Sequence, residues 1–238
     1  MNLIKWLIQF FNNLSEEFYQ SIIEQDRYKF ILEGLGRTVI IAIFAVVIGV
    51  VLGVLLALIR NYHEETGKGK FLNKLAELYV TIIRGTPAVL QLMIIYYIKT
   101  VDINPVLVGI IAFGINSGAY VSEIIRSGIN SIDKGQKEAA SSLGLTYRET
   151  MKSIILPQAI RNVLPALGNE FITLLKETSV AGYIGIVDLV KAADIIASGT
   201  YNYFFPLIII AIIYLILTIG LSKLLTIFEK KVLNHARG

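Results

Sequence analysis

The feature that most constrains this chain is a run of 21 residues without a charged side chain, Val39–Ile59. A bilayer core about 30 Å thick needs roughly 20 apolar residues, because each residue of a helix adds about 1.5 Å. The run is too long for the apolar part of a signal peptide and lies too far from the N-terminus. It therefore predicts a transmembrane helix.

Other apolar segments extend this prediction to five spans. The further candidates are Ala88–Ile98, Val106–Ser122, Leu164–Leu175 and Phe204–Leu221. We expect the first of these to be the second half of a helix that begins near Leu75 and is broken at Thr86 and Pro87. We expect the fourth span to carry Asn169 and Glu170. The sequence thus predicts an all-α membrane protein with five transmembrane helices, of which the second and fourth are partly polar.

The composition agrees with a membrane protein. Of the 238 residues, 55% are hydrophobic and 17% are charged, whereas soluble domains are nearer 45–50% and about 25%. The absence of cysteine excludes a disulfide scaffold and a cysteine-based zinc or redox site. The net charge of +4 is too small to indicate nucleic acid as a partner.

The positions of the basic residues predict the orientation. Lys and Arg accumulate in cytoplasmic loops. Of the 22 in this chain, five lie in the Arg60–Arg84 connection, six in the Arg126–Arg161 connection and four in the tail from Lys223. The loops on the other side hold Lys99, Lys176 and Lys191, and the N-terminal part holds four more basic residues accompanied by five acidic ones. Five spans then place the N-terminus outside and the C-terminus in the cytoplasm.

The chain is expected to have three parts. Residues 1–30 mix apolar and polar side chains and predict an amphipathic segment on the membrane surface, since the apolar stretch is too short to span. Residues 31–228 form the transmembrane domain, and residues 229–238 form a cytoplasmic tail. A cleaved signal peptide is the weaker alternative, because no small-residue cleavage site follows.

The cytoplasmic connection 131–157 has the pattern of two short helices separated by a glycine. Lys134–Leu143 suits a helix capped by Asp133 or Ser131, and Gly144 suits a left-handed stop. Residues 146–149 form a capping box that begins the second helix, and Pro157 begins the fourth span. Such a unit can act as a rigid docking element, although an ordinary amphipathic loop has the same pattern.

These residues resemble a known family. The spacing of the Glu138-Ala139-Ala140 triplet, Gly144 and Pro157 is that of the EAA loop, which marks permease subunits of bacterial ABC importers. Further segments resemble the polar amino-acid permeases that transport histidine, arginine or glutamine: residues 31–60, 84–87, 119–129 and 169–179. The chain therefore resembles a permease subunit with the type I ABC importer fold.

The resemblance implies partners and cofactors. Such a permease pairs with a second copy or a close paralogue, two ATP-binding subunits dock below it, and an extracellular protein delivers the amino acid. ATP and Mg²⁺ belong to the ATP-binding subunits, and this chain binds no cofactor. The residues expected to couple to the ATPase are Glu138, Ala139, Ala140, Ser141, Leu143, Gly144 and Leu145.

Sequence motifs for catalysis do not contradict this interpretation. A phosphate-binding loop requires G-x-x-x-x-G-K-[ST], and the Gly-Lys pairs at residues 67–70 lack it. His63 and His235 lie far apart in sequence, so no metal site is expected. An ATP-independent carrier or channel and an intramembrane enzyme remain as alternatives from other functional classes.

Polar residues at membrane depth are candidate binding residues, because they are costly unless paired or facing a cavity. The expected substrate-binding residues are Thr86, Asn116, Ser117, Tyr120, Asn169, Glu170 and Thr173. Glu170 has no cation within four residues of it in the sequence. The resemblance associates the Asn169-Glu170 pair with arginine, lysine or histidine as substrate, with glutamine as the alternative. A salt bridge between helices would explain Glu170 equally well.

Three other residues are expected to form a gate or an ion pair: Glu123, Arg126 and Lys176. Glu123 shares a helix face with Asn116 and Tyr120 and lies nearer the cytoplasm. Lys176, with Thr178 and Ser179, could line the same cavity or could anchor a helix end. Two Gly-x-x-x-Gly pairs, at residues 49 and 53 and at residues 114 and 118, predict close helix packing.

Overall fold

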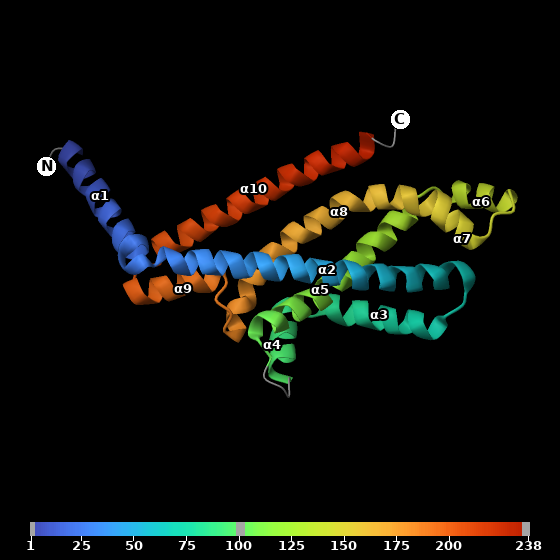
Figure 1. The fold of residues 1–238 in the computed structure, drawn as a ribbon, viewed down its shortest axis with the longest axis horizontal. Coiled ribbons are helices and arrows are strands. Elements are labelled where there is room, and N and C mark those ends of the chain that lie inside the picture. The colour runs from blue at the N-terminus through green and yellow to red at the C-terminus, as the bar shows by residue number, and fades with distance from the viewer. Residues whose placement is uncertain (1–2, 99–102, 235–238) are drawn as a thin grey trace.

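A computed structural model describes residues 3–98 and 103–234 and contains only helices and their connections in these ranges. The α-helices are α1 (Leu3–Phe18), α2 (Tyr28–Thr66), α3 (Lys70–Gly85), α4 (Ala88–Ile98), α5 (Pro105–Asn130), α6 (Lys134–Ser142), α7 (Tyr147–Thr150), α8 (Leu156–Glu177), α9 (Leu189–Thr200) and α10 (Phe204–Asn234). Short π or 3₁₀ turns connect some of them, at η1 (Tyr19–Ile23), η2 (Glu24–Asp26), η3 (Met151–Ile155) and η4 (Thr178–Ile184). Figure 1 shows α2 running along the molecule beside α3, α5 and α9.

The long helices correspond to the predicted spans. Within the described ranges, α2, α5 and α10 are long and apolar enough to cross a membrane, and the bent α3–α4 pair adds a fourth if it is one broken span. The predicted fourth span is α8, which has 22 residues and contains Asn169, Glu170 and two prolines. Because of these residues, α8 is less apolar than α2, α5 and α10.

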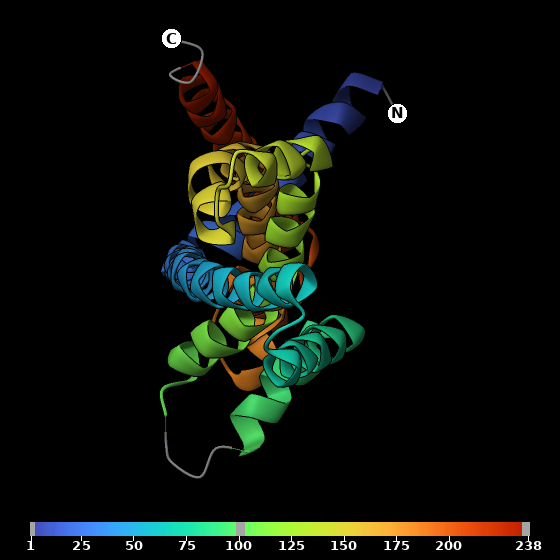
Figure 2. The same ribbon diagram turned by 90° about the vertical axis from the view of Figure 1, so that its right-hand side faces the viewer.

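The predicted second span is a broken helix. Thr86 is extended, with φ −124° and ψ 146°, because a following proline disfavours the helical conformation of the residue before it. Pro87 itself has no N–H to donate. The result is a bend of 108° between α3 and α4, so the break predicted at residues 86 and 87 is confirmed and α4 projects away from the bundle (Figures 1 and 2).

The two Gly-x-x-x-Gly pairs pack α2 against α5 within one chain. A Cβ atom added at Gly49 would lie 2.7 Å from Ser117 Oγ, and one added at Gly53 would lie 2.4 Å from Val121. From the other side, Gly114 meets Ile48 at 2.8 Å. These glycines therefore allow the two backbones to approach, and α2 and α5 form the tightest helix pair of the fold.

The N-terminal segment forms an amphipathic helix. Helix α1 keeps its polar side chains on one stripe and exposes large apolar ones, among them Trp6, Ile8 and Phe11. It projects from the bundle, as does the C-terminal end of α10 (Figure 2). Helix α10 continues to Asn234, so the first residues of the predicted tail are helical. Lys99, His235 and Arg237 lie outside the described residues.

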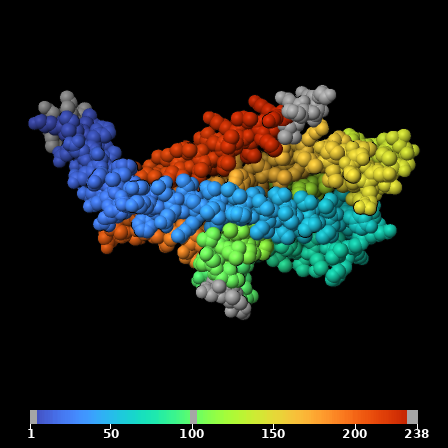
Figure 3. All heavy atoms as spheres, in the orientation of Figure 1, coloured from blue at the N-terminus to red at the C-terminus, as the bar shows by residue number. Residues whose placement is uncertain are grey.

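The two loops predicted to be cytoplasmic meet at one end of the molecule. Figure 3 shows the yellow α6–α7 segment beside the cyan-to-teal end of α2 and α3. Lys137 on α6 forms a salt bridge with Glu65 near the end of α2. The C-terminal part of α10 extends towards the same end (Figure 1). This arrangement agrees with the predicted orientation.

The α2–α5 contact predicts a stability difference between two glycine variants on one helix. Gly53→Ala should lower the free energy of unfolding by about 1–3 kcal/mol, because the added methyl group overlaps Val121 in a filled interface. Gly36→Ala is the control, since a Cβ there meets nothing within 4 Å. Thermal unfolding in detergent measures both, and equal midpoints for the two variants would contradict the packing.

Candidate functional site

Glu170 lies between α8 and α5 and is half-buried. Its Oε1 accepts a hydrogen bond of 3.0 Å from Ser117 Oγ. Ser117 is fully buried, and its side chain lies against Gly49 of α2, where a Cβ atom would be 2.7 Å from Ser117 Oγ. Within the described residues, Glu170 forms no salt bridge. The structure thus brings two predicted site residues together and leaves the carboxylate without a cation from that part of the chain.

A second polar group centres on Gln91 at the start of α4. Its Nε2 donates to the backbone oxygens of Ile83 and Thr86 and to Thr86 Oγ1, at 2.7, 3.0 and 2.7 Å. Its Oε1 accepts from Asn116 Nδ2 at 3.0 Å. Gln91 therefore satisfies the backbone groups that the break after α3 frees, and it ties the break to α5.

The remaining predicted substrate residues lie on exposed surfaces of this region. Asn169 and Thr173 are exposed on one face of α8, which they share with Lys176 of the predicted gate group. Tyr120 is half-buried on α5, and the guanidinium of Arg84 stacks over its ring at 5.5 Å. The structure thus separates the predicted set into a hydrogen-bonded interior part and an exposed strip on α8.

Glu123 lies among three arginines. It forms salt bridges with Arg60 on α2, with Arg84 on α3 at 3.7 Å, and with Arg126 one turn along α5 at 3.8 Å. Arg126 also pairs with Glu64. The predicted proximity of Glu123 and Arg126 is confirmed, and the cluster joins three helices near the end where the predicted cytoplasmic loops meet.

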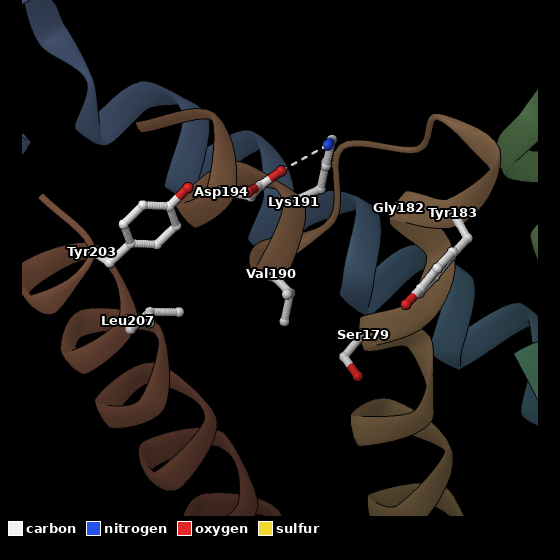
Figure 4. Close-up of a pocket in the computed structure, with 8 residues that line it drawn as sticks. All are labelled: Ser179, Gly182, Tyr183, Val190, Lys191, Asp194, Tyr203 and Leu207. Carbon is white, nitrogen blue, oxygen red and sulfur yellow. Dashed lines mark hydrogen bonds and ion pairs between the residues drawn. The ribbon is translucent and has the colours of Figure 1, made fainter. Parts of the chain in front are cut away.

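Lys176 is not part of that cluster. It lies in the last turn of α8. Asn162, which lines a hollow together with Glu123, lies near the opposite end of the same helix. Thr178 is buried and donates to Leu175 O. Ser179 instead lines a hollow of about 330 Å³ between η4, α9 and α10, beside the Lys191–Asp194 salt bridge (Figure 4).

The predicted docking loop has the local structure that its sequence indicates. Asp133 caps α6 by accepting from Gly135 N at 2.7 Å, and Gly144 adopts a left-handed φ of 75°. The capping box at residues 146–149 is complete. Hydrogen bonds from the Thr146 hydroxyl and backbone N–H hold the pKa of Glu149 below its usual value.

The same loop presents one face outwards and anchors the other to α2. Leu143 is 81% exposed, whereas Ala140 is 1% exposed, so Ala140 packs inwards and is not available for contact with another protein. Tyr147 Oη accepts a hydrogen bond of 3.0 Å from buried Asn61 on α2. Together with the Lys137–Glu65 salt bridge, this contact fixes the loop on the end of α2.

Sequence reasoning missed several residues of these groups. The sequence predicts no role for Gln91, a single polar residue within the apolar segment Ala88–Ile98. It places Arg60 and Asn61 in a connection between spans and predicts no partners for them. Gln91 lies five residues after Thr86 in a span, and a buried amide at that depth must have partners. The position of Gln91 within a span could therefore have indicated that its side chain has partners. No residue near Arg60 or Asn61 in the sequence indicates their partners, which lie 63 and 86 positions away.

Comparison with known proteins identifies relatives over most of the chain. Residues 49–234 match the family model described as "Binding-protein-dependent transport system inner membrane component". The putative glutamine transport system permease protein of Rickettsia bellii is 46% identical over 86% of this chain and 93% of its own length. The arginine transport system permease protein of Bacillus subtilis is 42% identical over 87% of this chain and 94% of its own length.

Solved structures share the fold. A crystal structure of an amino acid ABC transporter with histidines has a TM-score of 0.79 and 45% identity, covering 86% of this chain and 94% of its own. An inward-facing structure of a methionine ABC transporter matches with a TM-score of 0.64 at 20% identity, covering 87% of this chain and 94% of its own. At 20% identity, the match to the methionine transporter shows a shared fold only.

The Gln91 network predicts a loss of stability when its donors are removed. Gln91→Met should lower the free energy of unfolding by about 1–3 kcal/mol, because the acceptors at the α3–α4 break lose their buried donor. Gln20→Met, at an exposed position, is the control. Thermal unfolding in detergent reports the difference, and a Gln91→Met midpoint equal to that of the control would contradict the network.

Proposed function

Because the chain belongs to the family of inner membrane components of binding-protein-dependent transport systems, we propose that two copies of it form the pathway of an importer for basic amino acids. The coarser assignment is plain: this is a permease subunit of an amino acid ABC importer, not an enzyme by itself. The preference for basic amino acids, the homodimer and the roles of single residues belong to the proposal.

The observation that supports a basic substrate is Glu170. A half-buried carboxylate in a span is costly unless a cation or several donors approach it. Ser117 supplies one hydrogen bond, and Asn169 and Thr173 lie exposed beside it on α8. In the proposal the guanidinium, ammonium or imidazolium group of the substrate pairs with Glu170, and Asn169, Thr173 and Tyr120 line its path.

Glutamine is the second candidate. Five of the relatives are putative glutamine transport system permeases from Rickettsia, at 44–46% identity. The arginine permease of Bacillus subtilis is 42% identical. Overall identity therefore does not separate the two substrates. With glutamine as substrate, Glu170 would accept hydrogen bonds from its amide or α-ammonium group.

The proposal assigns the energy source to separate subunits. Two ATP-binding subunits, which hold ATP and Mg²⁺, dock on the exposed face of α6 and the turn after it. This face presents Glu138, Ala139, Ser141, Leu143 and Gly144. Leu143 supports the proposal most, because it is 81% exposed on this face and a docked protein can bury its apolar side chain. Ala140, which is buried, and Leu145, which is half-buried, lie beneath this face.

The remaining partners lie in and outside a bacterial inner membrane. An extracellular binding protein delivers the amino acid to the end opposite α6. A second copy of the chain completes the pathway, because the exposed polar strip of α8 can face neither lipid nor its own bundle at low cost. No nucleic acid is involved. The apolar sides of α2 and α10 face lipid.

The substrate assignment predicts a selective loss in one variant. Glu170→Gln should reduce arginine uptake about tenfold or more, which corresponds to roughly 1.4 kcal/mol of binding, while glutamine uptake changes little. Glu33→Gln is the control, since Glu33 makes an exposed pair with Arg37. Uptake into proteoliposomes that contain the assembled importer measures both amino acids. Unchanged arginine uptake would refute the cation site.

The docking assignment predicts uncoupling without unfolding. Leu143→Glu should abolish amino-acid uptake and the stimulation of ATP hydrolysis, because it places a charge where an apolar contact is proposed. The thermal midpoint should not change, since Leu143 is exposed. Lys70→Gln, which changes the charge equally on another exposed cytoplasmic position, should transport normally. Normal uptake by Leu143→Glu would argue against docking at this face.

A further inference from the structure

Helix α5 carries a polar stripe that continues beyond the predicted substrate residues. Its members recur at spacings of three or four residues and therefore share one face. They are Asn116, Tyr120, Glu123, Ser127 and Ser131, the last being the residue that caps the end of the helix. Ser127 and Ser131 are exposed, so the stripe is open at the cytoplasmic end.

Helix α8 carries a second stripe with the same spacing. Its members are Asn162, Ala166, Asn169, Thr173 and Lys176, and all except half-buried Ala166 are exposed. Two positions before Asn162 the surface is different, since Ile160 is apolar and 57% exposed. One side of α8 thus suits lipid, and the other suits water or a polar molecule.

The two stripes converge at their cytoplasmic ends. Asn162 Nδ2 donates a hydrogen bond of 2.9 Å to Ser131 Oγ, which joins the helices there. Beside this bond lies a hollow of about 490 Å³, lined by Glu123, Ser127, Ser131, Asn162 and Ala166 among others. An adjoining hollow of about 440 Å³ shares Glu123 and Ser127 and adds the guanidinium of Arg126.

The charges around this hollow suit an amino-acid zwitterion. The carboxylate of Glu123 can accept from an α-ammonium group, and the guanidinium of Arg126 can hold an α-carboxylate. The hydroxyl of Ser127 adds a neutral donor and acceptor between the two. Because Glu123 is shared by three arginines, the ligand exchanges one ion pair for another and leaves no isolated charge.

We propose that this hollow between α5 and α8 is a release subsite for the transported amino acid, separate from the Glu170 region and closed by the Asn162–Ser131 hydrogen bond. The proposal rests on the proposed function and deepens it by placing a second station on the cytoplasmic side. The amino acid moves along the α8 stripe from Asn169 to Asn162 and then leaves past Ser131. Recognition here is of the backbone zwitterion, so it is the same for arginine and glutamine.

The chain offers a direct test because it contains no cysteine. Single variants Ser127→Cys and Ala166→Cys each introduce the only thiol of the chain, and Ile160→Cys is the control on the opposite, apolar side of α8. The assembled importer in proteoliposomes is treated with a charged methanethiosulfonate reagent, with and without saturating L-arginine or L-glutamine. The rate of thiol modification is measured for each variant.

Ser127→Cys and Ala166→Cys should react at least tenfold faster than Ile160→Cys, and the imported amino acid should slow them severalfold. Adding Asn162→Ala should accelerate the Ser127→Cys reaction, since the hydrogen bond from Asn162 to Ser131 is lost. Rates equal to that of Ile160→Cys, or fast rates that no amino acid changes, would overturn the subsite. Import by the unsubstituted chain is measured in parallel, so that failure of the proposed function is distinguished from failure of the subsite.

Discussion

The close packing of α2 on α5 is the constraint on which the other features depend. Four glycines bring the two backbones together, and α2 is long enough, at 39 residues, to reach from α9 to the predicted docking loop at residues 131–157. Gly49 leaves space for the side chain of Ser117, which donates a hydrogen bond to Glu170. At the cytoplasmic end α2 contributes Arg60 to the Glu123 cluster and Asn61 to the loop. One contact surface thus positions both the binding region and its connection to the loop.

Polar groups in the bundle fall into two kinds. The Gln91 group is closed, since its donors and acceptors satisfy one another and a broken backbone. The Glu123 cluster pairs three arginines with two carboxylates, borders a hollow and can exchange partners. Glu170 is different, because a single hydroxyl is its hydrogen-bond donor within the described residues. An incomplete site of this kind is what a ligand can complete, whereas a closed one gives rigidity.

The sequence predicted features that depend on local chemistry. The capping box, the Gly144 stop and the break before Pro87 follow from residues within a few positions of each other, and each is present in the structure. The bend of 108° and the partners of Gln91, Asn61 and Glu123 could not be predicted in this way. The Arg60–Glu123 and Asn61–Tyr147 contacts join residues 63 and 86 positions apart. The first depends on the packing of α2 on α5, and the second on the position of α7 at the end of α2.

The position of the coupling loop suggests an order for the proposed transport cycle. The loop contacts α2 through Asn61 and Glu65, and α2 is packed tightly on α5. The loop, α2 and α5 therefore cannot move independently of one another over short distances. Helix α8 continues directly from the loop through η3, and the Asn162–Ser131 bond is the polar contact between α8 and the end of α5. Displacement of the loop therefore acts first on that bond and on the hollow beside it. In this scheme the cytoplasmic end opens before the Glu170 region rearranges, because Ser117 and Glu170 lie farther along both helices from the applied force.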